Sequence, residues 1–143
     1  MKAALVDTNI LIHTKSPTST EHARAKADIE RLLTDGYELF VCPQVLRECH
    51  KVMTTPTTSN GLGLSPAQAK AELQNILDTY SLTEDSNQSF IRWRFLVETY
   101  NVSGKNVHDT HIVACMLVHD INEVLTYNAK DFNRFNALIT VHS

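Results

Sequence analysis

Long hydrophobic runs are missing from this chain of 143 residues. No stretch approaches the roughly 18 consecutive apolar residues that a membrane-spanning helix needs. Residues 1–7 also lack the long apolar stretch and the cleavage-like site of a signal peptide. We therefore expect a cytoplasmic protein with no membrane segment. Internal repeats and low-complexity tracts are absent too, and the length suits a single domain over residues 1–143.

Positive charge is scarce as well, with 13 lysines and arginines against 16 aspartates and glutamates. This balance argues against a basic surface that binds nucleic acid on all sides. It does not exclude a nuclease, because bound divalent ions can supply the positive charge that a phosphodiester requires. Cys42, Cys49 and Cys115 have no paired metal-ligand spacing and lie in apolar surroundings. We expect three buried thiols rather than a disulfide or a zinc site.

The apolar residues predict strands that alternate with helices. Short apolar segments predict buried strands at 5–6, 38–42, 123–126 and 137–141. Helical spacing of apolar residues predicts helices at 21–33, 43–53, 66–80, 88–100 and 108–119. This alternation predicts an α/β fold with a parallel central sheet and helices on both faces. The polar segment 54–64, which contains one proline and two glycines, predicts a surface loop.

Asp7 directly follows the apolar run of residues 3–6. A carboxylate at the carboxyl end of a buried strand lies where open α/β sheets form their ligand crevices. The alternative for Asp7 alone is a cap on the helix that follows, because aspartate is a favoured N-cap residue.

Glu48 and Asp109 occupy core-side positions on predicted helices. Glu48 lies at the edge of an apolar face, three residues after Val45 and four before Val52. Asp109 precedes Ile112 by three residues and therefore projects over a face that should be buried. The alternatives are a glutamate at the edge of the core and an aspartate that complements the helix dipole.

Asp131 and Asn128 lie just past the predicted strand at 123–126, although Asp131 could also cap a short helix. Several acids are thus expected at one rim of the sheet. Carboxylates that meet there repel one another, which raises some of their pKa values unless a cation neutralises them. Oxygen ligands suit Mg²⁺ or Mn²⁺. The sequence therefore predicts a metal site for phosphodiester hydrolysis.

Four segments resemble, in order, the motifs of the PIN-domain family, and within it the VapC-like toxins of bacterial toxin–antitoxin pairs. They are residues 5–11, 43–48, 108–114 and 124–132, and they span nearly the whole chain. The resemblance implies a three-layer α/β/α sandwich, PIN-like, with a parallel central sheet. It also implies an endoribonuclease that depends on Mg²⁺ (or Mn²⁺), the toxin of a type II toxin–antitoxin pair.

The resemblance also assigns roles to individual residues. Asn128 stands where many members have the fourth acid, so either Asp131 takes this place or a second metal binds weakly. The implied metal ligands are Asp7, Glu48 and Asp109; the implied catalytic acids are these three and Asp131; the implied substrate-binding residues are Thr8, Asn9, Arg47, Thr126 and Asn128.

The expected partners are an RNA substrate, an antitoxin protein and a second copy of the chain. Although the net charge of the chain is negative, RNA would contact local basic residues. These are Arg47, Lys51, Lys105, Lys130 and Arg134. Aromatic side chains could stack bases, but the spacing of Phe90, Trp93 and Phe95 favours packing in the core.

Other functions fit part of the pattern. A PIN-domain nuclease that processes RNA without being a toxin is one alternative, and a weakly active interaction module, favoured by Asn128, is another. A zinc hydrolase could use His108 and His111 together with Asp7, but no third histidine has an obvious place. A phosphotransferase of the haloacid dehalogenase type would need an aspartate where this chain has Asn9.

Overall fold

A five-stranded parallel sheet forms the centre of the computed structural model, which describes residues 2–143. The strand order is β3-β2-β1-β4-β5. The strands are β1 Ala3–Val6, β2 Glu38–Val41, β3 Ser81–Leu82, β4 Glu123–Leu125 and β5 Thr140–His142. All four residues of the central strand β1 are buried, as expected for a parallel strand that is covered on both faces.

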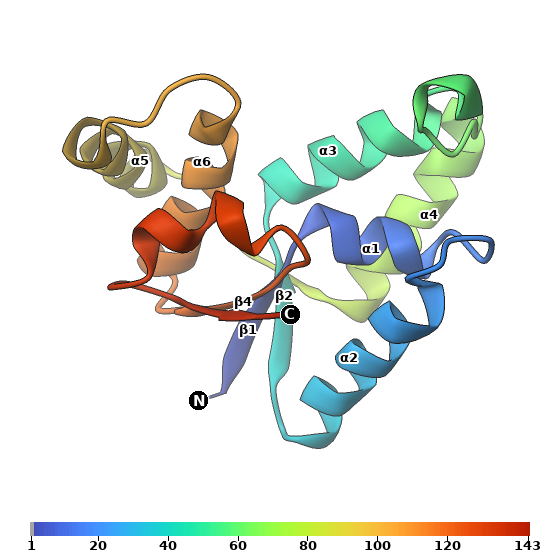
Figure 1. Ribbon diagram of the computed structural model, residues 1–143, viewed down its shortest axis with the longest axis horizontal. Coiled ribbons are helices and arrows are strands. Elements are labelled where there is room, and N and C mark those ends of the chain that lie inside the picture. Colours follow the sequence, from blue (N-terminus) through green and yellow to red (C-terminus); the bar gives the residue numbers. More distant parts are fainter. Residues whose placement is uncertain (1) are drawn as a thin grey trace.

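Six α-helices cover the two faces of this sheet: α1 Thr8–Thr14, α2 His22–Thr34, α3 Pro43–Thr54, α4 Pro66–Thr79, α5 Asn87–Tyr100 and α6 Asn106–Val118. Helices α1 to α4 lie on one side of the sheet, and α5 and α6 lie on the other (Figure 1). The direction of the strand order reverses after β3, so right-handed crossovers carry the next helices to the opposite face. The structure thus confirms the three-layer α/β/α sandwich.

Helix starts explain much of the local structure. Ser65 and Ser86 each form a capping box with the residue three positions later. Pro43 and Pro66 occupy first helical positions, where a missing N–H costs nothing. Asp7 accepts a hydrogen bond from the backbone of α1, so the capping role foreseen for it is real. Strand and helix therefore meet at Asp7 without a loop.

The core joins the sheet to the helices and to the C-terminal segment. Phe132 and Phe135 are fully buried in or beside short 3₁₀ helices at Ala129–Asp131 and Asn133–Phe135, and the ring of Phe135 meets that of Tyr100 edge-on at 5.0 Å. All three cysteines are buried and free, as predicted. Within residues 2–143, no helix is long and apolar enough to cross a membrane.

Three expectations need correction. The strand predicted at 137–141 is β5, Thr140–His142, because the chain turns after Phe135 and leaves Leu138 partly exposed. The edge strand β3 was missed, since two residues carry no periodic pattern. Phe90 and Phe95 do not pack in the core: they are 57% and 59% exposed, because α5 lies outside α6 and buries a different face.

Candidate active site

Asp7 lies at the carboxyl end of the central strand and is only 5% exposed. Its Oδ1 accepts a hydrogen bond from the backbone N–H of Thr8 at 2.8 Å. Its Oδ2 accepts from the Thr126 hydroxyl at 2.8 Å and from the Asn9 amide at 3.0 Å. These three donors hold the carboxylate in one orientation at the wall of a cavity.

Asn9 and Thr126 connect the start of α1 to the end of β4. The Asn9 side chain donates to the Thr126 hydroxyl at 3.1 Å and accepts from the backbone N–H of Tyr127 at 2.9 Å. Thr126 is fully buried and also accepts from the backbone N–H of Asn128 at 3.0 Å. Both side chains are thus occupied in orienting Asp7 and the chain after β4, although Asn9 also borders the cavity.

Glu48 extends from the middle of α3 toward the same cavity. Its Oε2 accepts from the Thr8 hydroxyl at 2.8 Å, and its Oε1 accepts from the Gln44 amide at 3.1 Å. Gln44 was not among the predicted site residues. Its position one helical turn before Glu48, on the same face, was the signal that could have found it.

Asp109, in the first turn of α6, completes a group of three acids that line one cavity of about 300 Å³. The other lining residues are Thr8, Asn9, Ile12, His13, Val52 and Asn128. His13 was also missed, because its face of α1 gave no periodic signal of a site. The structure therefore brings together acids that are 41 and 61 residues apart in sequence, as predicted.

A second cavity of about 450 Å³ shares Thr8, Glu48, Val52 and Asp109 with the first. Asp131 lies here and not in the first cavity. Cationic side chains border it as well: Arg47, Lys51 and Lys105; His108 is a further lining residue. Arg47 is held by Asp85 at 2.9 Å, whereas Lys130 and Arg134 line neither cavity.

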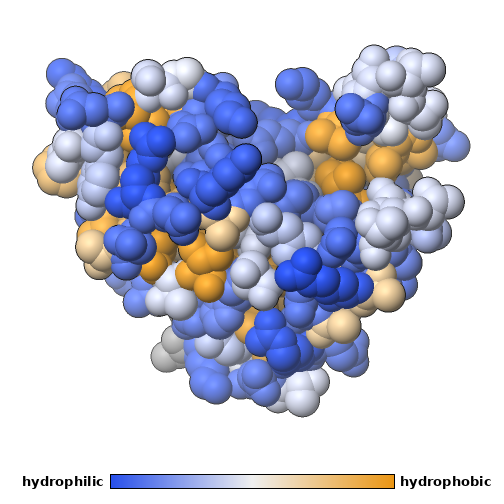
Figure 2. Space-filling model, viewed as in Figure 1, coloured by the Kyte–Doolittle hydropathy of each residue, from blue (hydrophilic) through white to orange (hydrophobic). Residues whose placement is uncertain are grey.

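The cleft that these two adjoining cavities form has a hydrophilic surface. Figure 2 shows a notch between the lobe that carries α5 and α6 and the lobe that carries α3 and α4, and the residues along this notch are mainly hydrophilic. Acids and lysines thus meet in one open region between the two helical layers.

The electrostatics of the cleft show a surplus of negative charge. Burial and, less strongly, the nearby Glu48 together raise the pKa of Asp7 to about 6 against three opposing hydrogen bonds. Burial also raises the pKa of Asp109 to about 7, with contributions from Asp131, Asp7 and Glu48. These carboxylates repel one another at neutral pH, so an all-oxygen donor set of this kind fits a hard divalent cation such as Mg²⁺ or Mn²⁺.

The two histidines proposed for a zinc hydrolase do not converge on Asp7. His108 borders the second cavity. The Nε2 of His111 lies 3.7 Å from Asp85 instead, and its Nδ1 lies 3.3 Å from Gln44. His111 therefore faces a different part of the molecule from the three acids.

The fold and the cleft define an α/β protein with an acidic site at the carboxyl edge of a parallel sheet. Comparison with protein families matches the PIN domain over residues 4–138. The chain therefore belongs to the PIN-domain family.

Individual relatives are similar over nearly their whole length. The chain is 25% identical over 134 residues to ribonuclease VapC48 of Mycobacterium tuberculosis, covering 92% of this chain and 91% of that protein. A toxin–antitoxin complex from Klebsiella pneumoniae contains a chain with 21% identity and a TM-score of 0.67, at 98% and 96% coverage. The sarcin–ricin loop cleaving toxin VapC20 of M. tuberculosis has 16% identity and a TM-score of 0.67, at 96% coverage of both chains.

Proposed function

We propose that this protein is a divalent-metal-dependent endoribonuclease, the toxin of a type II toxin–antitoxin pair. The observation that carries this proposal is the shared cavity of Asp7, Glu48 and Asp109. Membership of the PIN-domain family and the similarity to ribonuclease VapC48 support RNA as the substrate.

Asp7, Glu48 and Asp109 would hold Mg²⁺ or Mn²⁺. A bound divalent ion supplies positive charge beside the scissile phosphate and makes water a stronger nucleophile. Asp7 is oriented in advance by its three donors, and Thr8 and Gln44 orient both oxygens of Glu48. Fixed ligands of this kind lose little entropy when the substrate complex forms.

The second cavity is the proposed path of the RNA backbone. Lys51 and Lys105 border it beside the acids, and phosphate oxygens attract such cations. Asp131 is the proposed fourth acid, since it lies close enough to Asp109 to raise its pKa. We assign Asn128 to the substrate, because it lines the cavity of the three acids but carries no charge. Arg47 contributes less, since Asp85 already pairs with it.

The test is cleavage of an RNA panel with Mg²⁺ or Mn²⁺ by the wild-type protein and by Asp7→Asn. Cleavage should require the metal, stop on chelation and fall to background in the variant. Asp120→Asn is the matched control, because Asp120 is exposed and lies outside both cavities. Full activity of Asp7→Asn would refute the assignment, and release of inorganic phosphate instead of oligonucleotides would indicate a phosphatase.

A calorimetric titration with Mn²⁺ separates the enzyme from a weakly active interaction module. Binding that Asp7→Asn loses supports the nuclease. No binding to the wild-type protein favours the module, whose acids would then have no ligand.

We further propose a cytoplasmic protein with an antitoxin partner that covers the acidic cleft, and a homodimer. The solved toxin–antitoxin complex from K. pneumoniae supports the antitoxin. The product of a short reading frame next to this gene should co-purify with the protein and stop cleavage. Cleavage without any such inhibitor would favour an RNA-processing nuclease that is not a toxin.

A further inference from the structure

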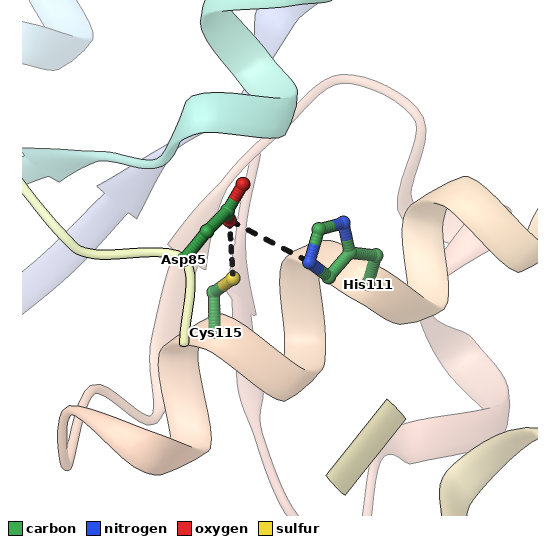
Figure 3. A group of neighbouring side chains, drawn as sticks. All are labelled: Asp85, His111 and Cys115. Carbon is green, nitrogen blue, oxygen red and sulfur yellow. Dashed lines mark hydrogen bonds and ion pairs between the residues drawn. The ribbon is translucent and has the colours of Figure 1, made fainter. Parts of the chain in front are cut away.

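A second group of ligand-type side chains lies apart from the three acids. Asp85 belongs to the loop between β3 and α5, and His111 and Cys115 lie one turn apart on α6 (Figure 3). Asp85 Oδ1 is 3.7 Å from His111 Nε2 and 3.9 Å from Cys115 Sγ. One ligand atom from each residue lies within 4.8 Å of the others.

These separations suit a tetrahedral zinc ion. Zinc bonds of about 2.0–2.3 Å place neighbouring ligand atoms roughly 3.3–3.8 Å apart. Asp85 Oδ1 is already near this distance from both other atoms, and the third separation is within 4.8 Å, so side-chain shifts of up to about 1 Å would bring the three atoms to bonding distance. A thiolate, an imidazole and a carboxylate together also favour Zn²⁺ over Mg²⁺, because Mg²⁺ avoids sulfur and nitrogen ligands.

The neighbouring hydrogen bonds point the lone pair of His111 into the group. Gln44 donates its amide N–H to Glu48, so its carbonyl oxygen faces His111 Nδ1 at 3.3 Å. Nδ1 must then carry the proton, which leaves the lone pair on Nε2. Histidines that bind metals almost always donate their other ring N–H in this way.

The other two side chains are oriented as well. Arg47 holds Oδ2 of Asp85 at 2.9 Å, which leaves Oδ1 toward His111 and Cys115. Cys42 lies beside Cys115, and the sulfur of Cys115 is buried and free. A zinc ion would displace the thiol proton, so the sulfur would bind as a thiolate.

We propose that Asp85, His111 and Cys115 form a zinc site, distinct from the carboxylate site, with water as the fourth ligand. A cavity of about 380 Å³ gives access, since Asp85 and His111 line it together with Ser89 and Trp93. The ion would tie the loop after β3 to α6. Through Gln44 it would also restrain Glu48.

Cobalt is the probe that reports this site, because Co²⁺ takes zinc positions and absorbs by charge transfer only when sulfur is bound. The experiment uses the full chain with Asp7→Asn, which removes a ligand of the carboxylate site. One equivalent of Co²⁺ should produce the thiolate band, and Zn²⁺ should displace it. Cys115→Ser should abolish the band, and Asp85→Asn should weaken Zn²⁺ binding at least about tenfold.

Matched controls keep the result specific. Cys49→Ser changes another buried cysteine, and Glu84→Gln changes the exposed neighbour of Asp85; both should keep the band and the affinity. Because Asp85 is an exposed loop residue, Asp85→Asn tests the site even where Cys115→Ser fails to fold.

Two results would overturn the proposal. One is an Asp7→Asn protein that binds Co²⁺ without a thiolate band, or whose Zn²⁺ affinity is unchanged when Asp85→Asn is added. The other is alkylation of Cys115 by iodoacetamide at a rate that Zn²⁺ does not slow, which would indicate a metal-free imidazolium–thiolate pair.

Discussion

The cavity of the three acids and the Asp85–His111–Cys115 group use the same helix in different ways. Helix α6 presents Asp109 to the first, and two and six residues later it presents His111 and Cys115 to the second. At about 100° per residue, Asp109 lies about 160° from His111 and about 120° from Cys115 around the helix, while His111 and Cys115 lie only about 40° apart. The three acids offer oxygen ligands alone, whereas the second group offers oxygen, nitrogen and sulfur, so the two should select different cations.

The largest expected effect is a loss of RNA cleavage that leaves metal binding at the second group unchanged. Asp7→Asn should lower RNA cleavage at least about 1,000-fold, which is about 4 kcal/mol of transition-state stabilisation, because it removes the central charge that holds the ion. The same variant should keep the Co²⁺–thiolate band. Parallel measurement of single-turnover cleavage and cobalt absorption checks both statements, and loss of the band would mean that the regions are not independent.

The next effect tests the hydrogen bond from Thr126 that orients Asp7. Thr126→Val keeps the shape of a fully buried side chain but removes the hydrogen bond to Asp7. It also removes the oxygen that accepts from the Asn9 amide and from the backbone N–H of Asn128. We expect a loss of about 2 kcal/mol in unfolding free energy, measured by urea denaturation. Cleavage should fall while the zinc affinity stays unchanged.

Thr140→Val is the control for this change, since Thr140 is exposed on the edge strand β5. Equal destabilisation by both variants would show that the hydrogen bonds of Thr126 add nothing.

A smaller effect concerns pH. The folded-state pKa values of Asp7 and Asp109 lie above the unfolded value of 3.8, so the folded protein binds more protons than the unfolded one between about pH 4 and 7. The unfolding free energy of the metal-free protein should therefore fall as the pH rises through this window, which is a penalty on stability. Asp109→Asn should remove part of it and raise the melting temperature at pH 8 by roughly 3 °C, for about 1 kcal/mol.

Thermal melts at pH 5 and pH 8 measure this penalty. The gain from Asp109→Asn should shrink at pH 5, and Mn²⁺ should stabilise the wild-type protein more at pH 8 than at pH 5. A gain of equal size at both pH values would show that charge repulsion is not its cause.

The smallest effect falls on the residue that links the two regions. Gln44→Leu removes the contacts to Glu48 and to His111 at once. Cleavage and Zn²⁺ affinity should each fall by roughly three- to tenfold, because one partly exposed hydrogen bond contributes about 1 kcal/mol. Gln74→Leu, on the exposed face of α4, is the control. An effect on cleavage alone would show that Gln44 orients Glu48 but does not affect metal binding through His111.

Much of the fold could be predicted because periodicity reports which face of each element is buried. The parallel sandwich follows from strands that alternate with helices, and the ends of five helices lie within about two residues of expectation. Periodicity says nothing about packing at the edges. The exposed rings of Phe90 and Phe95 depend on α5 lying outside α6, and β3 depends on a neighbour to pair with.

The sequence by itself determined the identity of the three acids and their place on one rim, since each stood at a strand end or on a core-facing helix position. Only the tertiary structure decided that Gln44 joins Glu48 to His111, and that Asp85 meets Cys115 across 30 residues of chain. Local spacing reports the orientation of a side chain on its own element. Which partner it meets depends on how the elements pack against one another.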